Sequence, residues 1–226
     1  MKISILIPCY NEEKTIISIL QKIKSNIDFN NEIIVVDDFS SDNTYKLLSE
    51  NSRLFDKLIK NEKNFGKGYS IRKSLKHASG DYVLIQDSDL EYDPADYKKL
   101  LIPIINQNAD VVYGTRFYGG SSRKIHFFWH TLANKILTFL CNMRTNLNLT
   151  DMECGYKIFK KSLVNKIDLK ENRFGFEPEI TIKLSKIKAS FYEVGINYYG
   201  RSYKEGKKIS FKDALKALYI IFFCYY

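Results

Sequence analysis

The sequence Glu32-Ile33-Ile34-Val35-Val36-Asp37-Asp38 begins as a β-branched, apolar run and ends in two acids. Four consecutive apolar residues predict a strand buried on both faces, as in a parallel sheet. Residues 3–8 and 82–86 are similar apolar runs that also lead into polar residues. Helices are predicted between them, over 12–25 and 69–77. Strands that alternate with helices indicate βαβ units and an α/β fold, with a mostly parallel sheet covered on both faces.

The remaining segments extend this pattern and then change it. After residue 118 the chain is richer in aromatic and basic residues. We expect one domain over 1–226, with a first half (1–118) and a second half (119–226). The further predicted helices are 94–105, 125–144, 178–187 and 211–226, together with a short helix around Tyr45–Leu48; the further strands are 58–59, 110–114, 156–159 and 190–197.

Composition limits the classes of protein. The 226 residues are 45% hydrophobic and carry 35 Lys and Arg against 26 Asp and Glu, a net charge of +9. This balance suits an anionic partner, such as a phosphorylated ligand, an anionic lipid surface or nucleic acid. Four widely separated cysteines indicate a reduced compartment. No stretch supplies the ~20 apolar residues of a transmembrane helix. We therefore expect a cytoplasmic protein that can also lie peripherally at the cytoplasmic face of the membrane.

Polar and acidic residues follow three of the predicted strands, at 10–12, 37–38 and 87–89. The carboxyl ends of parallel strands meet at one edge of a sheet, where ligands bind. Gathered acids repel one another, so a cation is expected among them. Carboxylates are hard ligands that suit Mg²⁺ or Mn²⁺. Each motif alone could equally be a turn or a helix cap.

The glycine-containing loop 64–68 excludes two common classes of nucleotide-binding protein. It lacks the Gly-x-x-x-x-Gly-Lys-Ser/Thr spacing of a phosphate-binding loop and the Gly-x-Gly-x-x-Gly dinucleotide fingerprint. An NTPase and a dinucleotide-dependent oxidoreductase are therefore disfavoured.

Taken together and in order, these motifs resemble glycosyltransferase family 2, whose members are inverting enzymes with the GT-A fold. The matching stretches are Pro8-Cys9-Tyr10-Asn11-Glu12, 35–44, 64–68 and Gln86-Asp87-Ser88-Asp89-Leu90-Glu91. Further stretches are similar to the dolichyl- or polyprenyl-phosphate hexose synthase branch: 114–117, 150–157, 174–179 and 201–208. The resemblance covers nearly the whole chain and implies transfer of a hexose from a nucleotide sugar, of the GDP-mannose or UDP-glucose type, to a lipid phosphate.

The resemblance also implies roles for individual residues. The first half would bind the nucleotide sugar and the second half the acceptor. Asp151 and Asp89 are the expected catalytic residues, and Glu91 stands where this branch often has Gln. The expected metal ligands are Asp87, Asp89 and Glu91, holding Mg²⁺ or Mn²⁺. The expected donor-binding residues are Pro8, Tyr10, Glu12, Val36, Asp38, Asp87, Ser88, Arg116, Arg201 and Lys207.

The acceptor decides whether a base is needed. A lipid phosphate is already anionic near neutral pH, whereas a hydroxyl acceptor must lose a proton to a carboxylate. Asp151 is the better candidate for that base, or for orienting the acceptor and the metal, and Glu177 is the weaker one. The alternative function is the same donor chemistry on a glycan or small-molecule hydroxyl in cell-surface polysaccharide synthesis. A basic, non-catalytic binder of nucleic acid or membrane is a third class, and the acids at the strand ends oppose it.

The predicted helix 125–144 has aromatic residues and cationic edges. Such a helix can lie in a membrane interface. It could equally be a core helix or a dimer contact. The apolar tail 214–226 has the same three alternatives.

Overall fold

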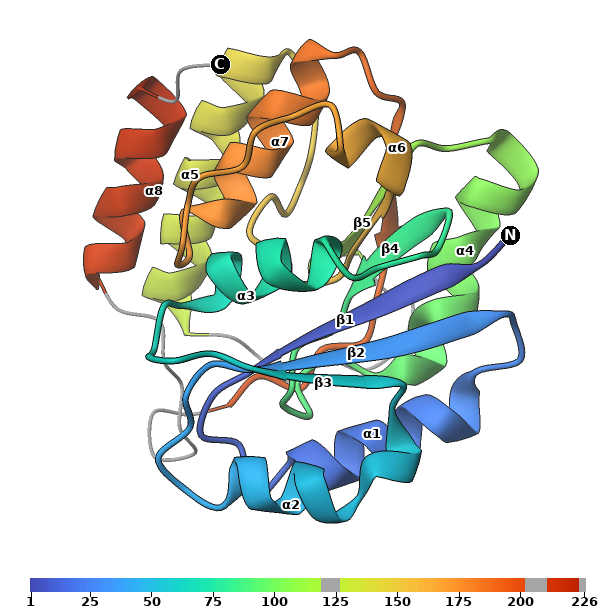
Figure 1. The fold of residues 1–226 in the computed structure, drawn as a ribbon. Helices are drawn as coiled ribbons and strands as arrows, with labels where there is room; N and C mark the ends of the chain where they lie inside the picture. The colour runs from blue at the N-terminus through green and yellow to red at the C-terminus, as the bar shows by residue number, and fades with distance from the viewer. Residues whose placement is uncertain (119–126, 202–210, 224–226) are drawn as a thin grey trace.

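The computed structural model describes residues 1–118, 127–201 and 211–223. Its centre is a seven-stranded sheet in the order β3-β2-β1-β4-β6-β5-β7 (Figure 1). β6 pairs antiparallel with β4 and β5, and the other strand pairs are parallel. The predicted mostly parallel sheet is confirmed. The strands are β1 (Ile3–Cys9), β2 (Asn31–Asp37), β3 (Lys57–Lys60), β4 (Tyr82–Ile85), β5 (Val111–Thr115), β6 (Lys157–Lys160) and β7 (Phe191–Gly195).

Helices cover both faces of this sheet, as predicted. Figure 1 shows α1, α2 and α4 on one face and α3, α5, α7 and α8 on the other. The helices are α1 (Ile16–Asn26), α2 (Thr44–Glu50), α3 (Lys67–Leu75), α4 (Tyr97–Gln107), α5 (Phe128–Thr145), α6 (Lys161–Val164), α7 (Phe176–Lys186) and α8 (Phe211–Phe223), with short 3₁₀ turns η1 (Ser52–Leu54) and η2 (Pro94–Asp96).

The two faces of the sheet form two separate apolar cores. Ile5 and Leu84 belong to the core under α1 and α4, whereas Leu6 and Val83 belong to the core under α3, α5, α7 and α8. Because side chains alternate along a strand, a strand buried on both faces must be apolar throughout. This is the physical reason for the continuous apolar runs in the sequence.

The first helix begins later than its apolar spacing predicts. It was expected from residue 12, but α1 starts at Ile16. The Glu12 carbonyl accepts hydrogen bonds from the N–H groups of Thr15 and Ile16, at 3.0 and 2.9 Å, so residues 12–15 form a turn. The turn leaves Glu12 at the end of β1, beside the ends of β2 and β4.

Three helices of the second half lie side by side on one face of the sheet, α5, α7 and α8 (Figure 1). Leu137 and Cys141 of α5 and Ala217 and Ile220 of α8 are buried. Besides the residues that pack into the core, α5 and α8 carry a set of apolar residues on their outer sides that are exposed. Its members are Phe128, Trp129, Leu132, Ile136, Phe139 and Met143 of α5, Phe127 just before α5, and Leu215, Tyr219, Phe222 and Phe223 of α8.

Two sequence expectations concern thiols and membrane spans. Cys9, Cys141 and Cys154 are buried, and none of them forms a disulfide within the described residues, whereas Cys224 lies outside those residues. Within the described parts of the chain, no helix combines the length and the apolar character needed to cross a bilayer.

Candidate active site

The carboxyl ends of β1, β2 and β4 are neighbours, because β1 pairs with both other strands. The polar residues that follow these strands therefore come together, as the topology predicts. Glu12 follows β1, Asp38 follows β2, and Asp89 follows β4. All three are buried, with at most 8% of each residue exposed. Burial of charged groups at a strand edge requires nearby counter-charges.

Arg201 supplies one of these counter-charges. Its guanidinium lies 2.5 Å from Asp89 Oδ2, 3.1 Å from Glu12 Oε1 and 3.2 Å from Glu91 Oε1. The backbone N–H of Arg201 also donates to Glu91 Oε1, at 2.8 Å. A residue near the end of the chain thus closes the site formed by the first half. The sequence predicts a cation among these acids, and the guanidinium of Arg201 is a positive group that lies among them.

Asp89 remains strongly perturbed despite this pairing. Burial, with Asp87 and Glu91 close by, raises the pKa of Asp89 to about 7, and Arg201 only partly opposes the rise. Three carboxylates, those of Glu12, Asp89 and Glu91, share the single guanidinium of Arg201. Such a site favours the approach of additional positive charge.

Lys67 supplies the second counter-charge. It is the first residue of α3, and its ammonium lies 2.8 Å from Asp87 Oδ1 and 3.1 Å from Glu177 Oε1. Burial alone would lower the pKa of Lys67, but the two carboxylates outweigh burial and raise it. Lys67 was quoted in the loop motif without a role, and it is a site residue that sequence reasoning missed. Its only signal was the position of a lysine between two glycines.

Asp38 organises the loop that leads to Lys67. Its carboxylate accepts hydrogen bonds from Asn61 Nδ2 at 2.6 Å, from the N–H of Phe65 at 3.0 Å and from the N–H of Gly66 at 2.7 Å. Gly66 has φ +105°, a left-handed conformation that favours glycine. The expected contact of Asp38 with the donor remains a prediction, and the hydrogen bonds show that the same carboxylate holds the loop in place.

A further ion pair joins Arg116 to Asp151. The guanidinium forms two hydrogen bonds of 2.7 Å with the fully buried carboxylate, and the Arg116 N–H adds a third at 3.0 Å. Asn134 Nδ2 donates at 2.8 Å. Burial would raise the pKa of Asp151, but Arg116 and these hydrogen bonds lower it. A carboxylate committed to four donors suits the predicted orienting role better than that of a base, which stays a prediction.

The other predicted site residues occupy different environments. Val36 is buried in β2, and Ser88 is 7% exposed, with its carbonyl accepting from Thr15 Oγ1 at 3.1 Å. Pro8 and Tyr10 are half-buried at the end of β1. Lys207 lies outside the described residues. Most of the predicted donor residues therefore lie at the ends of β1, β2 and β4 or in contact with residues there. They are Pro8, Tyr10, Glu12, Asp38, Asp87, Ser88 and Arg201.

The donor set fits a divalent cation in chemistry. Among the described residues, no three His, Cys, Asp or Glu side chains are already arranged around a metal position. Five carboxylates, however, share the two cations Lys67 and Arg201. Hard carboxylate oxygens with excess negative charge suit Mg²⁺ or Mn²⁺ that also bind phosphate and water. The carboxylates are those of Glu12, Asp87, Asp89, Glu91 and Glu177.

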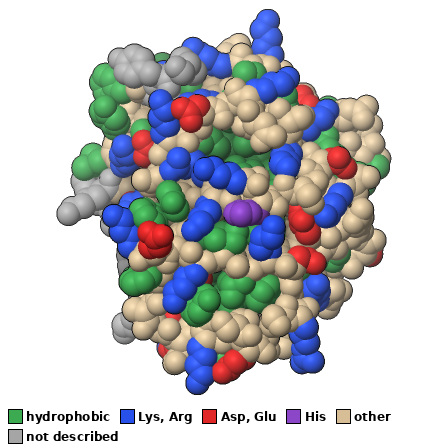
Figure 2. Space-filling view, in the orientation of Figure 1, with side chains coloured by type: hydrophobic (Ala, Val, Ile, Leu, Met, Phe, Trp, Pro, Cys, Tyr) green, Lys and Arg blue, Asp and Glu red, His purple; other side chains and the backbone are tan. Residues whose placement is uncertain are grey.

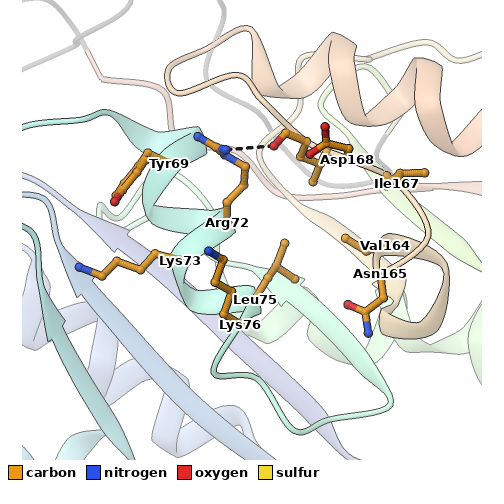
Figure 3. Close-up of a pocket in the computed structure, with 10 residues that line it drawn as sticks. Tyr69, Arg72, Lys73, Leu75, Lys76, Val164, Asn165, Ile167 and Asp168 are labelled. Carbon is orange, nitrogen blue, oxygen red and sulfur yellow. Dashed lines mark hydrogen bonds between the residues drawn. The ribbon is translucent and has the colours of Figure 1, made fainter. Parts of the chain in front are cut away.

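A separate pocket of about 330 Å³ lies between α3 and residues 164–169 (Figure 3). Arg72 crosses its rim and donates to the carbonyl of Leu169 at 3.0 Å. Lys and Arg side chains with apolar patches between them are spread over this face of the molecule (Figure 2). None of the lining residues belongs to the acid cluster, so this pocket is not part of the candidate site.

The sequence also matches a family of known proteins. The sequence model of the family described as Glycosyl transferase family 2 matches residues 4–168. The dolichol-phosphate mannosyltransferase of Pyrococcus furiosus is 30% identical over 215 residues, which cover 92% of this chain and 61% of that protein. The UDP-N-acetylglucosamine–dolichyl-phosphate N-acetylglucosaminyltransferase of Methanococcus voltae is 29% identical over 236 residues, 96% of this chain and 93% of that protein.

Comparison with solved structures confirms the predicted GT-A-like fold. Glucosyl-3-phosphoglycerate synthase from Mycobacterium tuberculosis, in complex with UDP, matches with a TM-score of 0.76 at 19% identity. The match covers 97% of this chain and 78% of that chain. A second structure of that enzyme contains Mn²⁺, UDP and glucosyl-3-phosphoglycerate.

Proposed function

Because the chain belongs to glycosyl transferase family 2 and is a glycosyltransferase, we propose that it transfers a hexose from a nucleoside diphosphate sugar to a polyprenyl or dolichyl phosphate. The donor is of the GDP-mannose or UDP-glucose type, and transfer inverts the anomeric carbon. The observation that carries the proposal is the cluster of Glu12, Asp89 and Glu91 around Arg201 at the carboxyl ends of β1 and β4. Relatives named for transfer to dolichyl phosphate support the acceptor class.

The reaction is a displacement at the sugar's anomeric carbon. An oxygen of the acceptor phosphate forms the new bond, the bond from that carbon to the diphosphate breaks, and the nucleoside diphosphate leaves. Arg201 and Arg116 are the groups that bind phosphate oxygens, because the guanidinium is a planar fork of donors. Before the ligands bind, carboxylates hold both guanidinium groups in place. Asp151 holds Arg116, and the acids at the ends of β1 and β4 hold Arg201.

A divalent cation, when bound, neutralises charge that grows on the departing diphosphate. Asp87, Asp89 and Glu91 are the residues that would hold Mg²⁺ or Mn²⁺. In the protein alone, Asp87 is paired with Lys67, and Asp89 and Glu91 with Arg201. Structures of glucosyl-3-phosphoglycerate synthase, which has a similar fold, contain UDP with Mn²⁺ or with Mg²⁺, and this supports the proposed metal.

A phosphate acceptor agrees with the environment of Asp151. A phosphate oxygen is already a nucleophile near neutral pH, so it does not need a base. Asp151 is fully buried and bonded to Arg116 and Asn134, and its proposed role is to orient Arg116. A hydroxyl acceptor would require a carboxylate that is free to accept a proton.

Contact with a membrane surface belongs to the same proposal. The acceptor is a lipid, and α5 and α8 lie side by side with exposed aromatic residues such as Trp129 and Phe222. Apolar side chains are visible at the left edge of Figure 2, where α8 lies. Lys135, Arg144 and Lys216 flank this face with positive charge that suits anionic headgroups. We place the enzyme peripherally at the cytoplasmic face.

A transfer assay with paired acceptors tests the proposed function. Labelled GDP-mannose and UDP-glucose are offered with Mn²⁺ and either polyprenyl phosphate or the matching polyprenol. We expect product only with the phosphate, and a loss of product in Asp89→Asn. Transfer to polyprenol or to a soluble glycan, abolished by Asp151→Asn, would instead support the hydroxyl acceptor and overturn the lipid-phosphate proposal.

A further inference from the structure

Lys67 connects the donor motif to the second half of the chain. Its side chain is 14% exposed, and its ammonium lies between Asp87 Oδ1 and Glu177 Oε1. Asp87 follows β4, whereas Glu177 lies in the first turn of α7. One cation thus spans the two halves of the molecule at the candidate site.

The second oxygen of the Asp87 carboxylate lies close to Gly155. A Cβ atom built on Gly155 would collide with Asp87 Oδ2, so the glycine leaves that oxygen room at this point. Among the contacts of the described residues, the ion pair with Lys67 is therefore the one that holds the carboxylate, and its direction depends on Lys67.

Glu177 anchors Lys67 from the opposite side. Its carboxylate is buried, and Oε2 has no hydrogen-bond partner among the described residues. Lys67 forms an ion pair with this carboxylate, and the buried ammonium of Lys157 adds a second favourable charge. Removing one member of a buried ion pair leaves the other charge uncompensated.

We infer that Lys67 is a positioning residue for the nucleoside diphosphate sugar: anchored on Glu177, it orients the Asp87 carboxylate for donor binding. The inference rests on the proposed function. The inference adds that Glu177, at the start of α7, affects the donor site through Lys67 and Asp87 without touching the donor itself. A lysine that only stabilises the fold would be required for folding but not for donor affinity.

Calorimetric titration separates these two roles. UDP and GDP, each with Mn²⁺, are titrated into the wild-type chain, Lys67→Met, Lys67→Arg and the control Lys76→Met, which lies at the exposed end of α3. We expect Lys67→Met to weaken binding of the nucleotide that the wild type prefers by about 10- to 100-fold, the range typical of residues that support a ligand-binding group. Lys67→Arg should recover most of the affinity, and Lys76→Met should match the wild type.

The double variant Lys67→Met/Glu177→Gln tests positioning against charge balance. It removes the uncompensated Glu177 charge, so we expect its melting temperature to recover towards the wild type while donor affinity stays low. Recovery of affinity together with stability, or unchanged affinity in Lys67→Met, would overturn the inference and leave the proposed function standing. Failure of the wild type to bind either nucleotide would overturn both.

Discussion

Single residues set the electrostatics of this site, and the pair Arg116–Asp151 shows how. Asp151 is completely buried, and the Arg116 side chain is 14% exposed. Asp151→Ala would leave the guanidinium without its counter-ion, at a cost of about 3–5 kcal/mol in the free energy of unfolding. Urea denaturation measures this loss. The exposed Asp168→Ala variant should change stability little, and an equal effect of both substitutions would contradict the assigned role.

Glu153 gives a prediction for pH dependence. Burial and the nearby Glu177 raise its pKa from 4.5 to about 8. Between these values the unfolded chain loses the Glu153 proton while the folded protein retains it, so stability falls as the pH rises. Glu153→Gln should therefore be more stable than the wild type at pH 8, by roughly 1–3 kcal/mol, and similar near pH 4.5. Denaturation at both pH values, with the exposed Glu62→Gln as control, measures the difference; a pH-independent difference would refute the assignment.

The sequence identified the acids of the site better than it identified their partners. Acids at strand ends are visible because the strands before them are continuous apolar runs. The pairing of Lys67 with Glu177, or of Asn134 with Asp151, joins residues far apart in the chain. Such contacts depend on how the two halves fold together, and local spacing does not encode them. Arg201 was found only because its motif resembled a family pattern.

At the scale of elements, the loop 169–175 crosses the start of α3. A Cβ on Gly68 would lie 2.5 Å from the carbonyl oxygen of Glu171 and 3.0 Å from Phe176 Cβ. Because a backbone atom cannot move cheaply, we expect Gly68→Ala to lower the free energy of unfolding by roughly 2 kcal/mol or more. Gly175→Ala is the matched control, since its nearest atom is the end of the flexible Glu171 side chain. Thermal or urea unfolding measures both variants. Equal and small decreases in the free energy of unfolding would show that the loop 169–175 can move at little energetic cost.

The exposed face of α5 and α8 gives a prediction about membranes. Trp129, the only tryptophan of the chain, is 74% exposed on α5 and reports on this face directly. Vesicles containing phosphatidylglycerol should shift its emission to the blue and sediment with the protein. Phe139→Asp should weaken vesicle binding by about tenfold, since it places a charge on the apolar surface. Ile105→Asp, at an exposed position of α4 on the other face of the sheet, should bind like the wild type. Equal losses in both variants would argue against a specific membrane face.

Most helices and strands were predictable from the sequence, but the order of the strands in the sheet was only partly predictable. Parallel β1, β2 and β4 follow from alternating strands and helices. The antiparallel insertion of β6 between β4 and β5 is different, because β6 follows β5 in the chain only after α5. That order comes from long-range pairing. The helix limits also shifted, as at Ile16, where a turn anchored on Glu12 replaced the expected first helical turn.

For the whole molecule, the two halves form one site because residues of the second half neutralise acids of the first. Arg201 reaches Glu12 and Asp89, and Glu177 reaches Asp87 through Lys67. Binding of a donor diphosphate with a divalent ion must rearrange these contacts, since the same carboxylates serve both. The molecule should therefore be stabilised by the complete set of ligands more than by nucleotide alone.

The proposed function requires the acids at the ends of β1 and β4 to hold a divalent ion together with the donor's diphosphate. An anomalous difference map from crystals grown with Mn²⁺ and UDP or GDP locates both groups. We expect a manganese peak at the Asp89 carboxylate, with the diphosphate bound to the same ion. Manganese and diphosphate located elsewhere, for example in the pocket between α3 and residues 164–169, would contradict it.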